Sequence, residues 1–263
     1  MKSLQGRNIV ITGASSGIGE RLAANAAALG ARPILIARTE DKLQKIAAKI
    51  QSETAVNPLY FALDVSDHDK VHEVFAEIYA QVGFVDILVN NAGFGIFEYL
   101  HETSIADMER MFAVNVLGLI ACTKEVLPSM LSENKGHIIN IASQAGKLAT
   151  AKSSGYSATK HAVLGLTNSL RMEVAKTSIN VSAVNPGPID TNFFEIADKS
   201  GNYVKNVKKF MLSTDYVADK ITALLLKPKR ELNLPKWMNA GSILYNLFPR
   251  IADRIMGGML DKK

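Results

Sequence analysis

Cysteine is almost absent from this sequence: Cys122 is the single one among 263 residues. It cannot form an internal disulfide, and no group of cysteines and histidines has the spacing of a metal site. Cys122 lies in an apolar helical pattern, so we interpret it as a small buried side chain. We therefore expect neither a disulfide framework nor a bound metal.

Strong charge and long apolar runs are also missing. The formal net charge is +5, and no basic run with interleaved aromatic residues occurs, which argues against nucleic-acid binding. No apolar run approaches the length needed to span a bilayer. The first expected strand begins within a few residues of Met1, which leaves no room for a signal sequence. We expect a cytoplasmic protein.

Short β-rich runs alternate with longer helical patterns, and no repeat or low-complexity linker interrupts them. This alternation predicts parallel strands joined by crossover helices. We expect one α/β domain over residues 1–263, with a doubly wound parallel sheet of six to seven strands and helices on both faces. Strands are expected at Asn8–Thr12, Pro33–Ala37, Leu59–Leu63, Asp86–Val89, His137–Ala142 and Asn180–Val184. Helices are expected at Ile18–Leu29, Asp41–Ile50, Ser66–Tyr79 with a capping box at Ser66–Asp69, Met108–Leu131 and Ser153–Lys176.

A glycine-rich loop joins the first expected strand to the first helix. At this junction a helix N-terminus can receive a pyrophosphate, and glycines let the backbone approach it. The spacing Gly13…Gly17-x-Gly19 differs from the usual G-x-G-x-x-G fingerprint. Its position nevertheless predicts a dinucleotide site of the Rossmann type. The expected cofactor contacts in this loop are Gly13, Ser15, Ser16, Gly17, Ile18 and Gly19.

The end of the second expected strand bears on which dinucleotide is bound. An acidic residue there would hydrogen-bond the ribose 2′-hydroxyl of NAD, but this strand ends in Ala37-Arg38-Thr39. The guanidinium fork of Arg38 suits a phosphate. The sequence favours NADP, and NAD remains the alternative.

Tyr156 and Lys160 are four residues apart on an expected helix, so both side chains can reach one place. A nearby ammonium lowers the pKa of a phenol, which we expect Lys160 to do for Tyr156. Tyr216 and Lys220 have the same spacing. They follow what looks like a helix start beyond the six strands, so we assign Tyr216 to packing.

Taken together, the motifs resemble those of the short-chain dehydrogenase/reductase family over roughly residues 6 to 195. The matching residues are Thr12-Gly13-x-x-x-Gly17-Ile18-Gly19, Asp64-Val65, Asn90-Asn91-Ala92-Gly93, Asn115, Ser143, Tyr156-x-x-x-Lys160 and Asn185-Pro186-Gly187.

The resemblance implies roles for each motif. Asp64 and Val65 would hold the adenine, and Asn91, Ala92 and Gly93 would pass beside the ribose. Pro186, Gly187 and Ile189 would flank the nicotinamide, and Thr191 would lie near its carboxamide. Asn115 would anchor a water that links Lys160 to solvent. A homodimer or homotetramer would form through the helices that start near Met108 and Tyr156.

The reaction expected from these residues is hydride transfer between the nicotinamide and a carbonyl or secondary alcohol. Ser143 and Tyr156 would bind the substrate oxygen, Tyr156 would supply the proton, and Lys160 would also bind the ribose. The catalytic set is therefore Ser143, Tyr156, Lys160 and Asn115. A dinucleotide-sensing regulator on the same fold is the alternative from a different class.

The last part of the chain is the least typical. Residues 188–212 correspond to the family's substrate lid. Residues 231–263 form an amphipathic extension in which Ile243, Leu244, Leu247, Phe248, Ile251, Ile255 and Met259 recur near helical spacing. This stripe packs on its own domain or a second subunit, or it rests on a membrane and admits a lipid-like substrate.

Overall fold

Seven parallel strands form the centre of the molecule in the computed structural model, which describes residues 3–148, 150–198 and 201–250. Their order, β3-β2-β1-β4-β5-β6-β9, is that of a doubly wound, Rossmann-type sheet. The predicted fold class is confirmed. The strands are β1 (Asn8–Thr12), β2 (Arg32–Ala37), β3 (Leu59–Ala62), β4 (Ile87–Asn90), β5 (Gly136–Ile141), β6 (Ile179–Pro186) and β9 (Glu231–Leu234).

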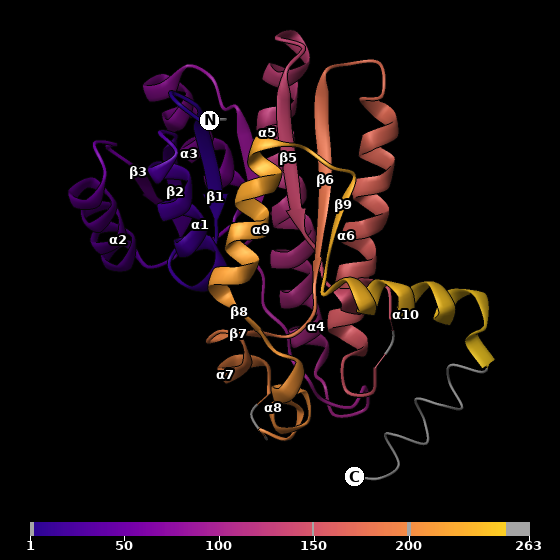
Figure 1. The fold of residues 1–263 in the computed structure, drawn as a ribbon. Coiled ribbons are helices and arrows are strands. Elements are labelled where there is room, and N and C mark those ends of the chain that lie inside the picture. The colour runs from indigo at the N-terminus through magenta and orange to yellow at the C-terminus, as the bar shows by residue number, and fades with distance from the viewer. Residues whose placement is uncertain (1–2, 149, 199–200, 251–263) are drawn as a thin grey trace.

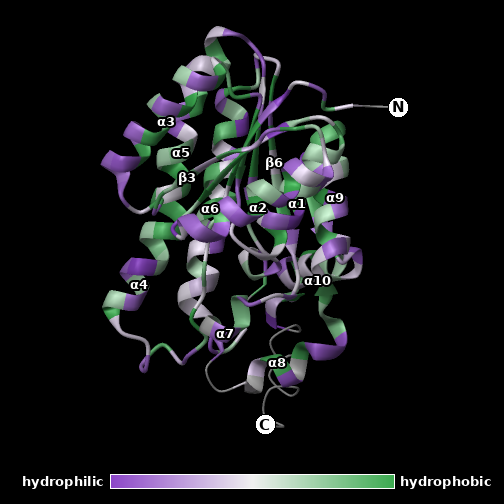
Figure 2. Ribbon diagram, turned by 90° about the vertical axis from the view of Figure 1, so that its left-hand side faces the viewer, coloured by the Kyte–Doolittle hydropathy of each residue, from purple (hydrophilic) through white to green (hydrophobic). Residues whose placement is uncertain are grey.

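Helices cover both faces of this sheet (Figure 1). One face packs on α1 (Gly17–Ala28), α2 (Glu40–Glu53) and α9 (Thr214–Leu226). The other packs on α3 (His68–Val82), α5 (Leu119–Ser132) and α6 (Ser154–Glu173). Figure 2 shows the apolar strands between these two helical layers. Because both faces are covered, the central strands read as continuous apolar runs.

The long helix expected at Met108–Leu131 is built from three parts. It begins at α4 (Ile105–Phe112), passes through a π-helical turn η1 (Ala113–Gly118) and continues as α5. This continuous stretch is long and apolar enough to cross a bilayer, contrary to the expectation that no segment would qualify. Burial of Cys122, Val126 and Met130 against the sheet identifies it as a helix of the domain core.

The expected capping box at Ser66–Asp69 is wrong. Asp67 is the N-cap of α3, and its side chain accepts a hydrogen bond from the Lys70 amide. Ser66 lies one residue before this N-cap, and its hydroxyl donates to the Asp64 carboxylate at 2.7 Å. Helix α3 therefore begins at His68, and Ser66 instead holds a residue of the candidate site.

The segment after β6 forms a separate small layer beside one edge of the sheet. Two short strands, β7 and β8, pair in parallel within it. Its elements are β7 (Ile189–Asp190), α7 (Phe193–Ala197), α8 (Asn202–Val207), η3 (Lys208–Phe210) and β8 (Leu212–Ser213). These residues coincide with the predicted lid.

The region expected as a C-terminal extension begins inside the sheet. Glu231–Leu234 forms β9 and pairs with β6, so the amphipathic part begins only at α10 (Lys236–Leu247). The sequence Glu-Leu-Asn-Leu gave little strand signal because an edge strand needs few apolar residues. Ile251, Ile255 and Met259 of the predicted stripe lie outside the described residues.

A partly buried ion pair attaches this C-terminal strand to the rest of the domain. Lys147 bonds the Glu231 carboxylate, and its ammonium also donates to Asn233 at 3.0 Å and Asn239 at 3.2 Å. Burial alone would raise the pKa of Glu231, but hydrogen bonds from Lys147 and Asn233 outweigh it and lower the net pKa. Lys147 thus links β9 and α10 to the loop that follows β5.

Replacing Lys147 should destabilise the fold measurably. We expect Lys147→Met to lower the free energy of unfolding in urea by about 2 to 4 kcal/mol, because it leaves the Glu231 carboxylate partly buried without its cation. Lys135→Met breaks the exposed pair between Lys135 and Glu133 and should cost under about 1 kcal/mol. Equal losses in the two variants would contradict a structural role for the Lys147 pair.

Candidate active site

A cavity of about 860 Å³ opens at the carboxyl ends of the parallel strands. This is the edge at which doubly wound sheets bind ligands. Gly19 and Asn115 do not line it, but the other residues predicted for the site do. These are Gly13, Ser15, Ser16, Gly17, Ile18, Arg38, Asp64, Val65, Asn91, Ala92, Gly93, Ser143, Tyr156, Lys160, Pro186, Gly187, Ile189 and Thr191.

The N-terminus of α1 faces this cavity through the glycine-rich loop. Ser16 is the N-cap residue, yet its side chain makes no capping hydrogen bond. The first amides of α1 therefore lack a side-chain acceptor, and a helix N-terminus in this state attracts an anion. Ser15, Ser16 and Gly17 line the cavity at this point. The arrangement fits a pyrophosphate.

Two glycines are required by close packing in this loop. Gly13 has φ +65°, and a β-carbon there would lie 2.9 Å from the Ala92 backbone. At Gly19 a β-carbon would lie 2.4 Å from the Gly13 carbonyl oxygen, so its role is to bring helix and loop together. The Asn91 side chain holds the loop by donating to the carbonyls of Thr12 and Gly13 at 2.9 and 3.1 Å.

Two basic side chains stand at the end of β2, where an NAD-binding protein would present an acid. Arg38 lines the cavity, and so does Lys42, which the sequence analysis missed although it lies four residues further on. Asp64 lines the same cavity. Burial raises the pKa of Asp64, but hydrogen bonds from Ser66 and the charge of Arg38 give a net lowering. The two cations fit a ribose that carries a 2′-phosphate.

The catalytic candidates come from β5 and α6. Ser143 follows the end of β5. Its hydroxyl accepts a hydrogen bond from the Ala145 amide at 3.0 Å, donates to the Pro186 carbonyl at 3.4 Å, and lies next to the phenol of Tyr156. Tyr156 lies in the first turns of α6 and is 9% exposed. The two hydroxyls therefore meet inside the cavity, where a substrate oxygen could bind both.

The structure corrects the expected pKa of Tyr156. Burial raises it far above the usual range of a tyrosine, the hydrogen bond from Ser143 lowers it by less, and Tyr203 raises it further. Lys160 was expected to lower this pKa, but desolvation of the phenolate is the larger effect here. Tyr156 is therefore a neutral phenol at pH 7.

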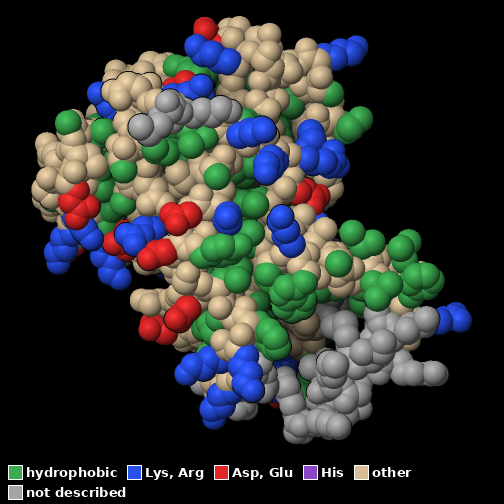
Figure 3. All heavy atoms as spheres, in the orientation of Figure 1, with side chains coloured by type: hydrophobic (Ala, Val, Ile, Leu, Met, Phe, Trp, Pro, Cys, Tyr) green, Lys and Arg blue, Asp and Glu red, His purple; other side chains and the backbone are tan. Residues whose placement is uncertain are grey.

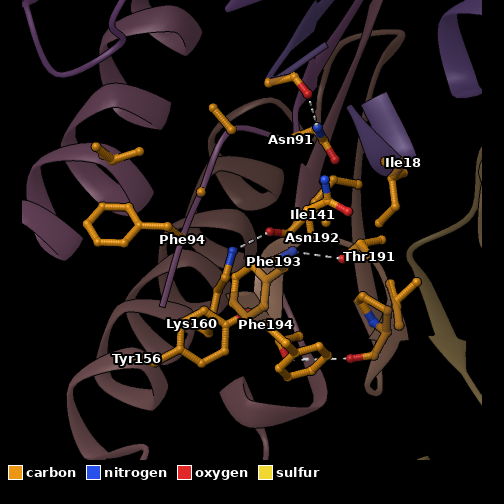
Figure 4. Close-up of a pocket in the computed structure, with 18 of the residues that line it drawn as sticks. Ile18, Asn91, Phe94, Ile141, Tyr156, Lys160, Thr191, Asn192, Phe193 and Phe194 are labelled. Atoms are coloured by element: carbon orange, nitrogen blue, oxygen red, sulfur yellow. Dashed lines mark hydrogen bonds between the residues drawn. The ribbon is translucent and has the colours of Figure 1, made fainter. Parts of the chain in front are cut away.

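Lys160 is held beside Tyr156 by a hydrogen bond to the backbone. Its ammonium donates to the Ile141 carbonyl at 2.8 Å and lies 5.7 Å from the centre of the Tyr156 ring. Figure 4 shows these two side chains with Phe193 lying against them. Burial lowers the pKa of Lys160 to about 8. Lys160 is still present as the ammonium at neutral pH, although burial makes this ammonium easier to deprotonate.

Asn115 occupies the π-helical turn and is buried. Its amide donates to the Phe94 carbonyl at 2.8 Å and to Thr159 at 3.1 Å, and its oxygen accepts from the Phe94 amide at 3.0 Å. Its side chain thus connects the loop after β4 to α6. The expected water relay at Asn115 stays a prediction.

Aromatic side chains form a wall that the sequence analysis did not assemble. Phe97 lies 5.6 Å from the Tyr156 ring and 4.6 Å from Tyr203, and Phe193 lies 5.6 Å from Tyr156, all centre to centre. These residues come from the loop after β4, α6 and the lid, so sequence spacing alone could not have joined them. Other lining residues that were missed include Phe94, Gln144, Leu148, Phe194, Val207 and Met238.

Tyr216 has no place in this cavity. It lies in the first turn of α9, where a helix start was expected, and it is 41% exposed. Lys220 lies 5.3 Å from its ring centre. The second Tyr-x-x-x-Lys pair is a surface contact of a helix N-terminus.

Known proteins are similar to this chain in sequence and in fold. An NADP-dependent 3-hydroxy acid dehydrogenase of Schizosaccharomyces pombe is 36% identical over 213 residues, which cover 78% of this chain and 82% of that protein. The structure of an alcohol dehydrogenase from the archaeon Thermococcus sibiricus with 5-hydroxy-NADP superposes with a TM-score of 0.77. It is 31% identical and covers 87% of this chain and 95% of its own.

A structure with a different cofactor is also similar. A short-chain dehydrogenase/reductase from Burkholderia phymatum in complex with NAD has a TM-score of 0.87 and 25% identity, and covers 95% of this chain and 96% of its own. The family described as short chain dehydrogenase matches residues 7–200. This chain belongs to the short-chain dehydrogenase/reductase family of oxidoreductases.

Proposed function

We propose that this protein is an NADP(H)-dependent oxidoreductase that reduces a neutral, apolar carbonyl compound or oxidises the corresponding secondary alcohol. The observation that carries this proposal is that the hydroxyls of Ser143 and Tyr156 line the same cavity, with the Lys160 ammonium 5.7 Å from the centre of the Tyr156 ring. When bound, the nicotinamide supplies or accepts the hydride.

The residues of the chain have separate tasks in this reaction. Ser143 and Tyr156 both donate to the substrate oxygen and stabilise the negative charge that develops on it. Tyr156 then gives up its proton; its raised pKa keeps the phenol protonated until an alkoxide, which is a much stronger base, forms. Lys160 places an ammonium next to the phenolate that remains. The hydroxyl and ammonium are held by strand and helix, so little reorganisation is needed.

Removing the phenol hydroxyl tests the proton donor. We expect Tyr156→Phe to lower turnover by roughly a hundredfold or more, with NADPH affinity nearly unchanged, because the ring and its packing on Phe97 and Phe193 are retained. Steady-state rates and a fluorescence titration of NADPH measure the two quantities. Tyr216→Phe, in the surface pair, should leave turnover unchanged. Near-normal turnover in Tyr156→Phe would show the assignment to be wrong.

Preference for NADP over NAD is proposed from the two cations at the end of β2, Arg38 and Lys42. A guanidinium hydrogen-bonded to a phosphate is worth about 1.5 to 3 kcal/mol, which corresponds to about tenfold to hundredfold in binding. The alternative is NAD, which the similar Burkholderia phymatum protein binds.

The cofactor preference can be measured directly. We expect Arg38→Leu to raise KM for NADPH by about tenfold or more while KM for NADH changes little. Arg32→Leu removes the same charge from an exposed position at the opposite end of β2 and should change neither value. If wild type preferred NADH, or if Arg38→Leu kept the full NADPH preference, the phosphate contact would be excluded.

The substrate class is proposed from what lines the inner part of the cavity. Phe94, Phe97, Phe193, Phe194 and Tyr203 form an aromatic wall around the Tyr156 ring. Among the described lining residues, the cations are Arg38, Lys42 and Lys160, which belong to the cofactor and catalytic ends. A carboxylate bound at the aromatic wall would therefore be desolvated without a counter-ion.

A matched substrate pair tests this difference. A 3-oxo acid and its methyl ester have nearly the same shape and differ in charge. We expect kcat/KM for the ester to exceed that for the acid by at least about tenfold. A tenfold ratio corresponds to about 1.4 kcal/mol, and burying a carboxylate without a partner costs more free energy than this. Equal values, or a preference for the acid, would contradict the proposed neutral substrate.

A further inference from the structure

Helix α10 exposes its apolar side chains and buries its polar face, which is the reverse of an ordinary surface helix. At 100° per residue, Trp237, Ala240, Ile243, Leu244 and Leu247 fall within an arc of about 120°. Four of them are large side chains with exposed fractions of 57% (Trp237), 53% (Ile243), 59% (Leu244) and 67% (Leu247). We call these five residues the α10 stripe.

The opposite face of α10 attaches the helix to the protein. Ser242 is 2% exposed, Asn239 accepts from Lys147 at 3.2 Å, and Met238 lines the active-site cavity beside Gly187. The helix is therefore fixed in orientation, and its apolar stripe faces away from the domain. Figure 1 shows α10 extending outward from the sheet. A contiguous exposed apolar surface of this kind marks an interaction site.

The stripe continues onto the lid. Phe210, which is 54% exposed, packs edge-on against Trp237 with ring centres 5.9 Å apart. Lys208 and Lys209 directly precede Phe210, Lys236 directly precedes Trp237, and all three are exposed. Figure 3 shows apolar side chains gathered over α10 and basic side chains over the neighbouring lid on one face of the molecule. Apolar and basic groups thus share one surface.

The positive charge of the chain is also concentrated in the segment that forms this surface. Residues 188–250, which include the lid and α10, contain ten Lys or Arg and six Asp or Glu, an excess of four positive charges. Residues 1–187 contain seventeen basic and seventeen acidic residues and have no net charge. Most of the net +5 of the protein therefore originates in the segment that carries the lid and α10. The partner of this surface should be apolar and anionic.

We propose that the α10 stripe and the adjacent lid lysines dock on the surface of an anionic phospholipid bilayer. An amphipathic helix binds there with its apolar face at the boundary between headgroups and acyl chains, and basic residues near it bind anionic headgroups. Trp237 has the amphipathic ring that is enriched at this depth. Because the inner face of α10 contributes Met238 to the cavity, the bilayer would lie next to the active site.

A second copy of this chain fits the surface less well. In a two-fold symmetric contact the same patch is used by both copies, so Lys208, Lys209 and Lys236 of both copies would lie in one interface. Like charges brought together in this way oppose association. Anionic headgroups would neutralise the same lysines.

The protein carries its own probe for this contact, because Trp237 is its single tryptophan. With full-length protein, we expect vesicles of phosphatidylcholine and phosphatidylglycerol to shift the tryptophan emission to the blue and to carry the protein upward in flotation. Pure phosphatidylcholine vesicles should bind it at least about tenfold less, since they lack the anionic headgroups. The absence of any blue shift or flotation with anionic vesicles would overturn the proposal.

Paired variants distinguish binding through the α10 stripe and the lid lysines from nonspecific hydrophobic adsorption and from an effect of net charge. Ile243→Ser with Leu247→Ser should lower vesicle binding by at least about tenfold. Leu100→Ser with Met172→Ser removes side chains of similar exposure elsewhere and should not. Lys208→Glu with Lys209→Glu should weaken binding, whereas Lys45→Glu with Lys49→Glu, exposed on α2, changes the net charge equally and should not. Equal effects within either pair would overturn the proposal.

Light scattering distinguishes the competing occupant. A blue shift that rises with protein concentration in the absence of lipid, together with a mass that falls when Ile243 and Leu247 are replaced, would show that a second copy covers the stripe and would refute membrane docking. Vesicle binding is measured without turnover. It can therefore fail or succeed independently of the proposed oxidoreductase activity.

Discussion

One hydrogen bond, from the Lys160 ammonium to the Ile141 carbonyl at 2.8 Å, fixes the geometry on which the candidate active site depends. Ile141 ends β5, so its carbonyl is held by the sheet. Two residues further along the chain stands Ser143, and one helical turn before Lys160 stands Tyr156. By joining α6 to the end of β5, this bond brings two hydroxyls together that neither element could position alone. The arrangement costs desolvation, which is visible in the lowered pKa of Lys160.

The sequence was sufficient where local patterns and burial agree. Continuous apolar runs such as Asn8–Thr12 predicted the central strands, because a strand covered on both faces has no polar side to show. Once the strands were predicted, the residues that line the cavity could be placed as well, because the carboxyl ends of parallel strands lie at one edge of the sheet. Strand β9 was missed because Glu231–Leu234 lies at the sheet edge and depends on pairing with β6.

The errors share one physical cause, which is that desolvation and tertiary partners leave no mark in residue spacing. The Tyr156-x-x-x-Lys160 pattern predicts a lowered phenol pKa, yet the aromatic wall around Tyr156 excludes water and raises it. Ser66 had the spacing of a helix cap, but Asp67 caps the helix and the Ser66 hydroxyl donates to the Asp64 carboxylate. The wall itself combines side chains from segments far apart in the chain, so it becomes visible only in three dimensions.

The lid, β9 and α10 are joined to one another and to the candidate active site by side-chain contacts. Lys147 binds Glu231 on β9 and Asn239 on α10, and it lies four residues after Ser143. Met238 adds the inner face of α10 to the cavity, and Trp237 joins its outer face to Phe210 of the lid. Helix α10 therefore contacts both the lid and the loop that follows Ser143. The C-terminal segment, the least typical part of the chain, in this way contributes directly to the site that carries its most typical motifs.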